Sequence, residues 1–212
     1  MSDTGTAPLL AGVLVFDAVE ELDFVGPWEV LGMAAKTRLP IAPRLVAKTT
    51  DPVRSACGLR VLPDHGFADA PAFDILIVPG GQGTRPGVDD ADLVGYVAKA
   101  AAKATWVASV CTGAALLGRA GLLDGRRATT HWLSMDFVAA NAPKTTLVKD
   151  ERVVFDGNVV TSAGVSAGID MTLSLLGRIF GAPAALSVQE KMEYYPEPPF
   201  GGRHPVTGRS SS

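Results

Sequence analysis

The sequence predicts an α/β fold, built as an open, mostly parallel sheet with helices on both faces. Short apolar runs rich in Val, Ile and Leu, such as residues 74–79 (DILIVP), are typical of strands buried on both faces. Amphipathic helical patterns alternate with these runs along the chain. At 212 residues, with 47% hydrophobic and 19% charged residues, the composition fits one large domain and excludes intrinsic disorder.

The individual elements follow from local signals. The predicted parallel strands are residues 11–16, 44–49, 74–79 and 105–110, and a loop is expected at 80–87. The first helix is expected from about Pro27, because proline suits a first helical turn. Later helices are predicted at about 89–103, 113–123, 164–181 and 183–192, with a weaker strand and helix around 128–140. Asp156-Gly157 predicts a type I′ turn between strands 152–155 and 158–161.

The domain organisation and location follow from composition. We expect a disordered N-terminus over residues 1–10, one domain over 11–195, and an extended Pro/Gly/Ser-rich tail over 196–212. A formal net charge of -3 gives no electrostatic reason to expect nucleic acid or an anionic membrane. No apolar run approaches the ~18 residues of a transmembrane helix, and no signal peptide is visible. A cytoplasmic location is therefore expected.

Cys111 is the first candidate for chemistry. It follows the strand at 105–110 and precedes a helical pattern, among the small neighbours Ser109, Thr112 and Gly113. Such a nucleophile elbow places a side chain at the carboxyl edge of the sheet, and a helix N-terminus there favours the thiolate, lowering the thiol pKa. The alternative is a buried structural thiol. Position favours the nucleophile, but the pattern recurs in several folds.

Two further positions lie at the same sheet edge. Gly80 and Gly81 end the strand at 74–79, and a glycine pair allows backbone N–H groups to approach developing negative charge. The alternative is a loop that only terminates the strand. Asp23 precedes the first predicted helix, where it is either a helix-start acid or a carboxyl in an apolar pocket that passes protons.

Histidine chemistry and metal binding receive little support. His131 lies twenty residues beyond Cys111, and a pocket-wall role suits it better than a base in a Cys–His pair. The three histidines are scattered without acid or cysteine partners at ligand spacing, so no metal site is expected. Neither a Walker loop nor a GxGxxG motif follows the first strand, which argues against a nucleotide cofactor.

The segments VFDAVEELDFVGPWEVL, DILIVPGG, VASVCTGAALLGRAGLLDGRRATTHW and DGNVVTSAGVSAGIDMTLSLL resemble the ThiJ/PfpI superfamily over about residues 11 to 200. The match is best with its isocyanide-hydrating branch, because Asp23 is followed by Gly26-Pro27, and Thr112 follows Cys111. Ser162-Ala163 departs from the more glycine-rich sequence of that branch. The resemblance implies a flavodoxin-like homodimer without metal or organic cofactor, acting on a small isocyanide.

Residue by residue, the resemblance implies a nucleophile at Cys111, an acid/base at Asp23, and a site contact at Thr112. It implies that the amides of Gly80 and Gly81 line the site. Pocket-wall positions are expected at His131, Trp132 and Val165.

Two other functions stay open at this stage. One is a glyoxalase- or deglycase-like cysteine enzyme. The other is a non-catalytic ligand-binding domain related to transcription regulators, although the chain shows no basic recognition helix after residue 200.

Overall fold

A computed structural model of the chain describes residues 7–197, 199 and 200. Within them, seven strands form one sheet in the order β10-β11-β7-β6-β1-β2-β5. The strands are β1 (Leu9–Leu14), β2 (Ile41–Ala47), β5 (His65–Gly66), β6 (Ile75–Val78), β7 (Trp106–Val110), β10 (Val153–Asp156) and β11 (Val159–Ser162). All neighbours are parallel except β10 and β11. The predicted mostly parallel sheet is confirmed.

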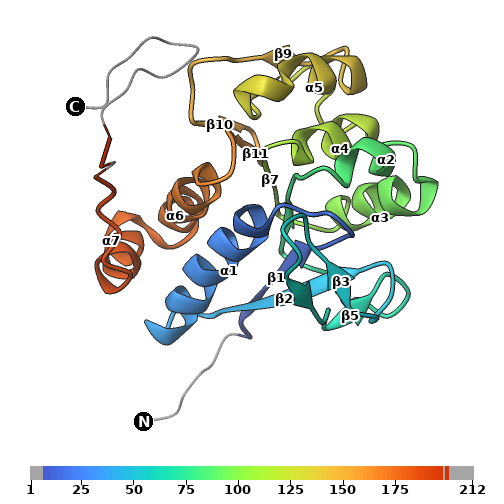
Figure 1. Ribbon diagram of the computed structural model, residues 1–212. Helices are drawn as coiled ribbons and strands as arrows, with labels where there is room; N and C mark the ends of the chain where they lie inside the picture. The colour runs from blue at the N-terminus through green and yellow to red at the C-terminus, as the bar shows by residue number, and fades with distance from the viewer. Residues whose placement is uncertain (1–6, 198, 201–212) are drawn as a thin grey trace.

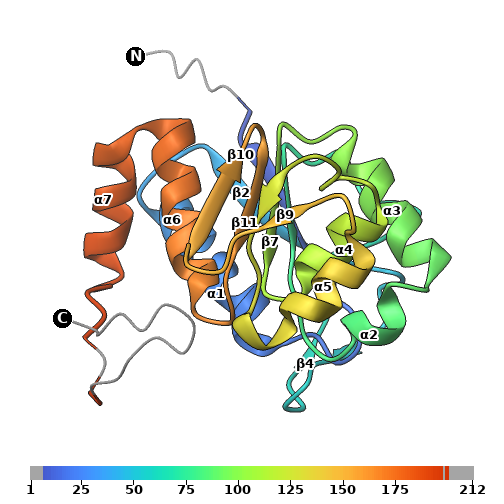
Figure 2. The same cartoon turned by 90° about the horizontal axis from the view of Figure 1, so that it is seen from above.

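Helices cover both faces of this sheet (Figures 1 and 2). One layer holds α1 (Glu21–Lys36), α6 (Ala167–Phe180) and α7 (Ala182–Lys191). The other holds α2 (Thr84–Gly87), α3 (Ala91–Ala101), α4 (Gly113–Arg119) and α5 (Met135–Asn141). The order β2-β1-β6-β7-β11 is the flavodoxin-like order. In such sheets, ligands bind beside the first strand, at the point where successive strands are added on its other side. This places a site at the carboxyl ends of β1, β6 and β7.

The strands belong to the core because their side chains are buried on both faces. Ile75 to Val78 are fully buried, and Val13 and Ile77 pack under the α1 layer. Leu76 and Val78 pack under the α3–α4 layer. This explains why the sequence runs are continuously apolar rather than alternating.

Several predicted boundaries are wrong. The first helix begins at Glu21 rather than near Pro27, so Pro27 lies inside it and Asp23 lies in its first turn. Acidic residues in a first turn favour the helix N-terminus, and this signal outweighs the proline preference. β1 begins at Leu9, so the disordered N-terminus predicted for residues 1–10 does not reach residue 10. Residues 84–87, expected as loop, form α2.

The remaining pieces are short. β3 (Val53–Arg54) and β4 (Arg60–Val61) form a small hairpin beside the start of α1, while β8 (Arg127–Ala128) pairs with β9 (Thr146–Leu147), and η1 (Trp132–Ser134) precedes α5. Residues 1–6, 198 and 201–212 lie outside the described residues, and with them most of the predicted tail. None of the helices described is long and apolar enough to cross a membrane.

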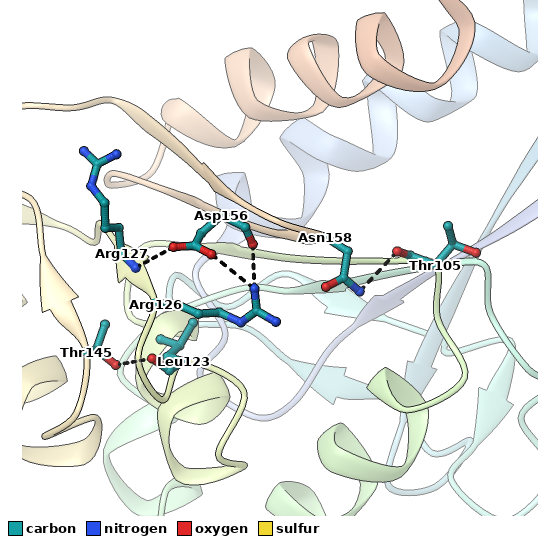
Figure 3. Close-up of polar contacts among 7 residues, drawn as sticks. All are labelled: Thr105, Leu123, Arg126, Arg127, Thr145, Asp156 and Asn158. Carbon is teal, nitrogen blue, oxygen red and sulfur yellow. Dashed lines mark hydrogen bonds and ion pairs between the residues drawn. The ribbon is translucent and has the colours of Figure 1, made fainter.

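The predicted hairpin at Asp156-Gly157 joins β10 to β11, with Gly157 at φ 61. Its turn is fastened to the rest of the domain by polar contacts (Figure 3). The Asp156 carboxylate accepts hydrogen bonds from the Arg127 N–H at 2.9 Å and the Arg126 guanidinium at 3.2 Å, and Arg126 also donates to the Asp156 carbonyl at 2.9 Å. Asn158 donates to the Thr105 carbonyl, just before β7. This turn lies at the amino-terminal end of β7, and Cys111 follows its carboxyl-terminal end.

Candidate active site

Cys111 lies at the turn between β7 and α4. It adopts φ 55, a left-handed conformation that costs energy for a residue with a side chain. Its own N–H is held by the carbonyls of Ser162 and Ala163, at the end of the neighbouring β11. At Gly113 a Cβ atom would overlap the carbonyl oxygens of Val78 and Pro79. The turn therefore needs a glycine two residues after the cysteine, because α4 begins directly against β6.

Asp23 lies behind the thiol and is completely buried. The segment between β1 and α1 brings it there, because the Glu20 N–H donates to the Gly80 carbonyl and Val19 bridges to Gly81. The Asp23 Oδ2 accepts the Gly80 N–H at 2.8 Å. Its Oδ1 is buried and accepts no hydrogen bond from the scaffold among the described residues. The Cys111 thiol interacts with the Asp23 carboxyl, so the carboxyl faces the cysteine with one oxygen that the scaffold does not hold.

The electrostatics of the pair are set by burial. Burial raises the pKa of Asp23 from 3.8 to about 7, the Gly80 N–H opposes the rise, and the charge of Glu20 adds to it. Burial also raises the pKa of the Cys111 thiol to about 12, and the Asp23 charge adds to that rise. N–H groups of Thr112 and Val165 oppose it only in part. The predicted lowering of the thiol pKa is wrong, because desolvation outweighs the start of α4.

The protonation states of the pair follow from these pKa values. At neutral pH the resting thiol is protonated, while the carboxyl is close to half ionised, since its pKa is about 7. Two buried groups that share a pocket do not both ionise freely. A carboxyl that titrates near the working pH is suited both to accept a proton and to return it.

Gly80 and Gly81 serve the scaffold in this structure. The Gly80 N–H is engaged by Asp23, and the Gly81 N–H donates to the Thr112 hydroxyl at 2.9 Å. Neither amide is a free donor, so the predicted role of both as free donors for developing charge does not fit. A Cβ atom at Gly80 would lie 2.5 Å from Thr112 N and Oγ1 and 2.9 Å from Asp23 Oδ2. Close approach, rather than anion binding, explains the glycine.

The Thr112 side chain ties the cysteine turn to β6. Its hydroxyl receives the Gly81 N–H and lies 3.0 Å from the Thr84 hydroxyl, which donates to the Gly81 carbonyl at 2.7 Å. Thr84 is fully buried. Its sequence context did not single it out, because GGQGTRPG indicates only a loop.

A cavity of about 240 Å³ opens above Cys111 and Thr112. Gly81, His131 and Val165 also line it, whereas Asp23 and Gly80 do not; the Asp23 carboxyl meets the site at the Cys111 thiol. Trp132 does not line it: its side chain is 43% exposed and lies at the start of η1. The other lining residues carried no signal in the sequence; they are Glu20, Gln82, Arg85, Leu133 and Ser134.

His131 is held in the wall by its neighbours. Its Nδ1 accepts the Leu133 N–H at 3.1 Å, and its ring lies where a Cβ atom of residue 164 would be, so Gly164 is required there. Burial lowers its pKa, which keeps the imidazole neutral at pH 7. Val165, across the cavity, adopts φ 45, an unusual conformation for a β-branched residue, and presents its N–H toward the sulfur.

One acidic cluster lies beside the site. Ligand atoms of Glu20, Glu21 and Cys57 come within 4.8 Å of one another. The Glu21 Oε1 already accepts hydrogen bonds from the Ser55 hydroxyl and the Cys57 N–H, which fasten the β3–β4 hairpin to α1. The geometry gives Glu21 a structural task.

Comparison with known proteins agrees with this geometry. The sequence pattern of the DJ-1/PfpI family matches residues 11–178, which include both Asp23 and Cys111. The chain belongs to the DJ-1/PfpI family.

Individual relatives sharpen the comparison. The isonitrile hydratase of Pseudomonas putida is 41% identical over 203 residues, covering 96% of this chain and 86% of that enzyme. A crystal structure of a ThiJ/PfpI family protein from Pseudomonas syringae superimposes with a TM-score of 0.84 at 34% identity, covering 94% of this chain and 84% of that one. The transcriptional regulator GbdR of Pseudomonas aeruginosa is 34% identical, but the match covers 65% of this chain and 37% of the regulator.

Proposed function

We propose that this DJ-1/PfpI protein is an isonitrile (isocyanide) hydratase, which converts an isocyanide and water into an N-substituted formamide. The observation that carries the proposal is the buried pair of Cys111 and Asp23, in which the carboxyl has a pKa of about 7 beside a protonated thiol. The 41% identity to the Pseudomonas putida enzyme over 96% of the chain supports the same reaction.

In the first half of the reaction, Cys111 adds to the isocyanide carbon. The Asp23 carboxylate accepts the thiol proton as the sulfur–carbon bond forms, because a thiol with a raised pKa is a poor nucleophile until it loses its proton. Asp23 then gives that proton to the same carbon, which carries the developing negative charge. The product is a covalent thioimidate, R–N=CH–S–Cys111, and the carboxylate is regenerated.

In the second half, water adds to the thioimidate carbon. Asp23 removes a proton from the attacking water and passes it to the nitrogen, giving a tetrahedral R–NH–CH(OH)–S–Cys111. In the collapse, Asp23 accepts the hydroxyl proton of this intermediate as the carbon–sulfur bond breaks and R–NH–CHO is released, and it returns that proton to the sulfur. One carboxyl thus alternates as base and acid over two easier steps. Hydration changes no oxidation state overall, so the proposed cycle requires no oxidant or reductant.

The surrounding residues support this cycle. The N–H groups of Thr112 and Val165 point toward the sulfur and stabilise the thiolate as it forms and as it leaves. Gly80 and Thr112 hold the carboxyl and the cysteine turn in register. The neutral His131 ring and Leu133 form the wall against which the substituent R packs.

A paired assay tests the proposal. An aryl isocyanide and methylglyoxal are offered to the same preparation, and loss of each is followed with formation of its product. Consumption of the isocyanide with release of the formamide is expected. Turnover of methylglyoxal alone would favour the glyoxalase- or deglycase-like alternative. Thermal stabilisation by ligands without turnover of either would favour a non-catalytic ligand-binding domain.

We also propose a cytoplasmic homodimer. Exposed apolar side chains on α1 and on the hairpin attached to it give a surface that a second copy would bury. They are Leu22, Val25, Leu59 and Leu62. Light scattering at micromolar concentration is expected to give about twice the chain mass of 22.0 kDa, and a monomer mass would contradict the dimer.

A further inference from the structure

A second, larger cavity lies at the same edge of the sheet. Its volume is about 480 Å³, within the range of small-molecule sites. The carboxyl ends of β1 and β2 form its floor, and α2 with the start of α3 closes one side. Ligands of open α/β sheets bind at the carboxyl ends of strands, so the position is that of a binding site. It shares no lining residue with the cavity above Cys111.

The floor of the second cavity is apolar. Val15, Val53 and Leu93 are buried there, and the half-buried rings of Phe16 and Phe67 stand at its side. The Phe67 ring stacks against Tyr96 with centroids 3.9 Å apart, so its position is fixed. This floor accepts the hydrophobic body of a ligand and offers aromatic rings to a positive charge.

The rim of the second cavity carries a net negative charge, because its lysine is already paired with aspartates. Lys48, the one cation among the lining residues, already contacts Asp92 at 2.7 Å and Asp90 at 3.5 Å. Asp17 and Asp51 are exposed on the rim and have no ion-pair partner among the described residues. Each uses one oxygen locally: Asp17 accepts the Arg54 N–H, and Asp51 accepts the Thr49 hydroxyl. The remaining carboxylate oxygens are available to a ligand.

The geometry points to a binding site for a small organic cation: a primary ammonium group at the rim that carries the Asp17 and Asp51 carboxylates, on an aromatic or aliphatic body that packs against Phe16 and Phe67. The site is separate from the catalytic cavity. The segment 81–87 forms the wall between the two, with Gly83 and Pro86 on one side and Gly81 and Arg85 on the other.

The test compares three ligands with the same phenyl body. 2-Phenylethylammonium is titrated against the protein by calorimetry and by amide NMR, beside neutral 2-phenylethanol and anionic 3-phenylpropionate. We expect the ammonium ligand to bind at least about fivefold more tightly than the alcohol, since an exposed charge contact contributes up to about 1 kcal/mol. The propionate should not bind. Amide shifts should centre on Val15, Val53 and Leu93.

Variants supply the matched comparison. Asp17→Asn with Asp51→Asn removes both rim charges while keeping an oxygen to accept each local hydrogen bond, and should weaken ammonium binding by roughly tenfold. Asp64→Asn is the control: Asp64 is also exposed and also accepts a backbone N–H, that of Leu45, but lies outside the cavity. It should leave binding unchanged. Thermal unfolding of each variant verifies that it folds.

Three outcomes would overturn the site: equal affinity for the ammonium and the alcohol, no loss of affinity in the double variant, or shifts centred on Cys111 and His131. The measurement does not depend on turnover. Cys111→Ala should bind the ammonium ligand with wild-type affinity, so failure of this site and failure of the proposed hydratase activity are told apart.

Discussion

Two carboxyl groups at opposite ends of the parallel strands have pKa values shifted in opposite directions. At the hairpin edge, Asp156 accepts the Arg127 N–H and the Arg126 guanidinium, and these bonds hold its pKa below the ordinary value (Figure 3). At the carboxyl edge, the scaffold among the described residues offers Asp23 one hydrogen bond, from the Gly80 N–H, and burial raises its pKa to about 7. One carboxylate is held ionised, and the other is poised to exchange its proton.

The difference separates a structural acid from a reactive one. A carboxylate whose oxygens are satisfied by donors stabilises the fold in its charged form and has no proton to give at neutral pH. A buried carboxyl with an oxygen that the scaffold does not hold destabilises the fold, and such a group is typical of a functional site. The left-handed backbone at Cys111 and Val165 is a second destabilising feature near Asp23.

The largest effect is expected from removing the nucleophile. Cys111→Ala should reduce isocyanide turnover by roughly 10³-fold or more, because no covalent route remains. The fold should survive, since alanine keeps the Cβ atom and the polar contacts of the turn are made by its backbone. Steady-state turnover with circular dichroism checks both. Turnover near the wild-type rate would remove the covalent mechanism, and Cys111→Ser should behave in the same way as Cys111→Ala.

Exchanging the two carboxyls for amides tests the comparison directly. Asp23→Asn keeps the shape and the acceptor for Gly80 but has no acidic proton, so turnover should fall by ~10² or more. Asp23→Glu should retain part of the activity. Asp156→Asn removes an ion pair with Arg126 far from the site, so it should lower the melting temperature at pH 7 and leave turnover within about twofold. Equal losses of turnover in Asp23→Asn and Asp156→Asn would break the distinction.

Displacing the Asp23 carboxyl without changing its chemistry should reduce turnover somewhat less than replacing it. In Gly80→Ala the new methyl group would press on Thr112 and on Asp23 Oδ2, and a shift of about 1 Å in a catalytic group is enough for a ~10²-fold loss. Gly95→Ala is the matched control, because nothing lies within 4 Å of its Cβ position and it belongs to the α3 helix. It should preserve turnover and raise stability by up to about 1 kcal/mol. Full activity in Gly80→Ala would show that the contact is not needed.

The last effect is on the pH dependence of stability, and not on turnover. Because the pKa of Asp23 rises from 3.8 to about 7 on folding, its contribution to the free energy of unfolding is fully present below pH 3.8 and is lost as the pH rises through 7. The loss amounts to as much as about 4 kcal/mol. Urea unfolding of wild type and Asp23→Asn at pH 4 and pH 8 measures it: wild type should lose stability relative to the variant. A constant difference between the two pH values would contradict the burial argument.

The fold could be predicted from the sequence because each buried parallel strand is a continuous run of apolar residues. The continuous apolar runs of β1, β6 and β7 and the Asp156-Gly157 turn each identify an element without knowledge of its partners. Ends were less predictable, as Pro27 shows. Its place inside α1 depends on a first turn that contacts Gly80 and the β3–β4 hairpin, which are distant in the chain.

The site was predictable in its members and less so in their state. Position after a strand brought Cys111 and Gly80 forward as candidates, position before a helix brought Asp23, and the family resemblance brought Thr112; the structure gathers the four residues. The protonation of the thiol and the committed N–H groups of Gly80 and Gly81 could not be predicted, because they depend on burial and on distances between segments. Thr84 and Arg85 escaped notice for the same reason, since α2 follows a glycine-rich run with no helical period.

The Asp23–Gly80 hydrogen bond joins residues 57 positions apart in the chain, and it bears on the order of events during folding. Parallel strands pair only after long segments between them have closed, so contacts of this kind form slowly. The N-terminal half of a nascent chain already contains Asp23 and Gly80, but Cys111 and Val165 are synthesised later. Refolding followed by activity should therefore lag behind refolding followed by helical circular dichroism, and the catalytic pair would report when the last strands have joined the sheet.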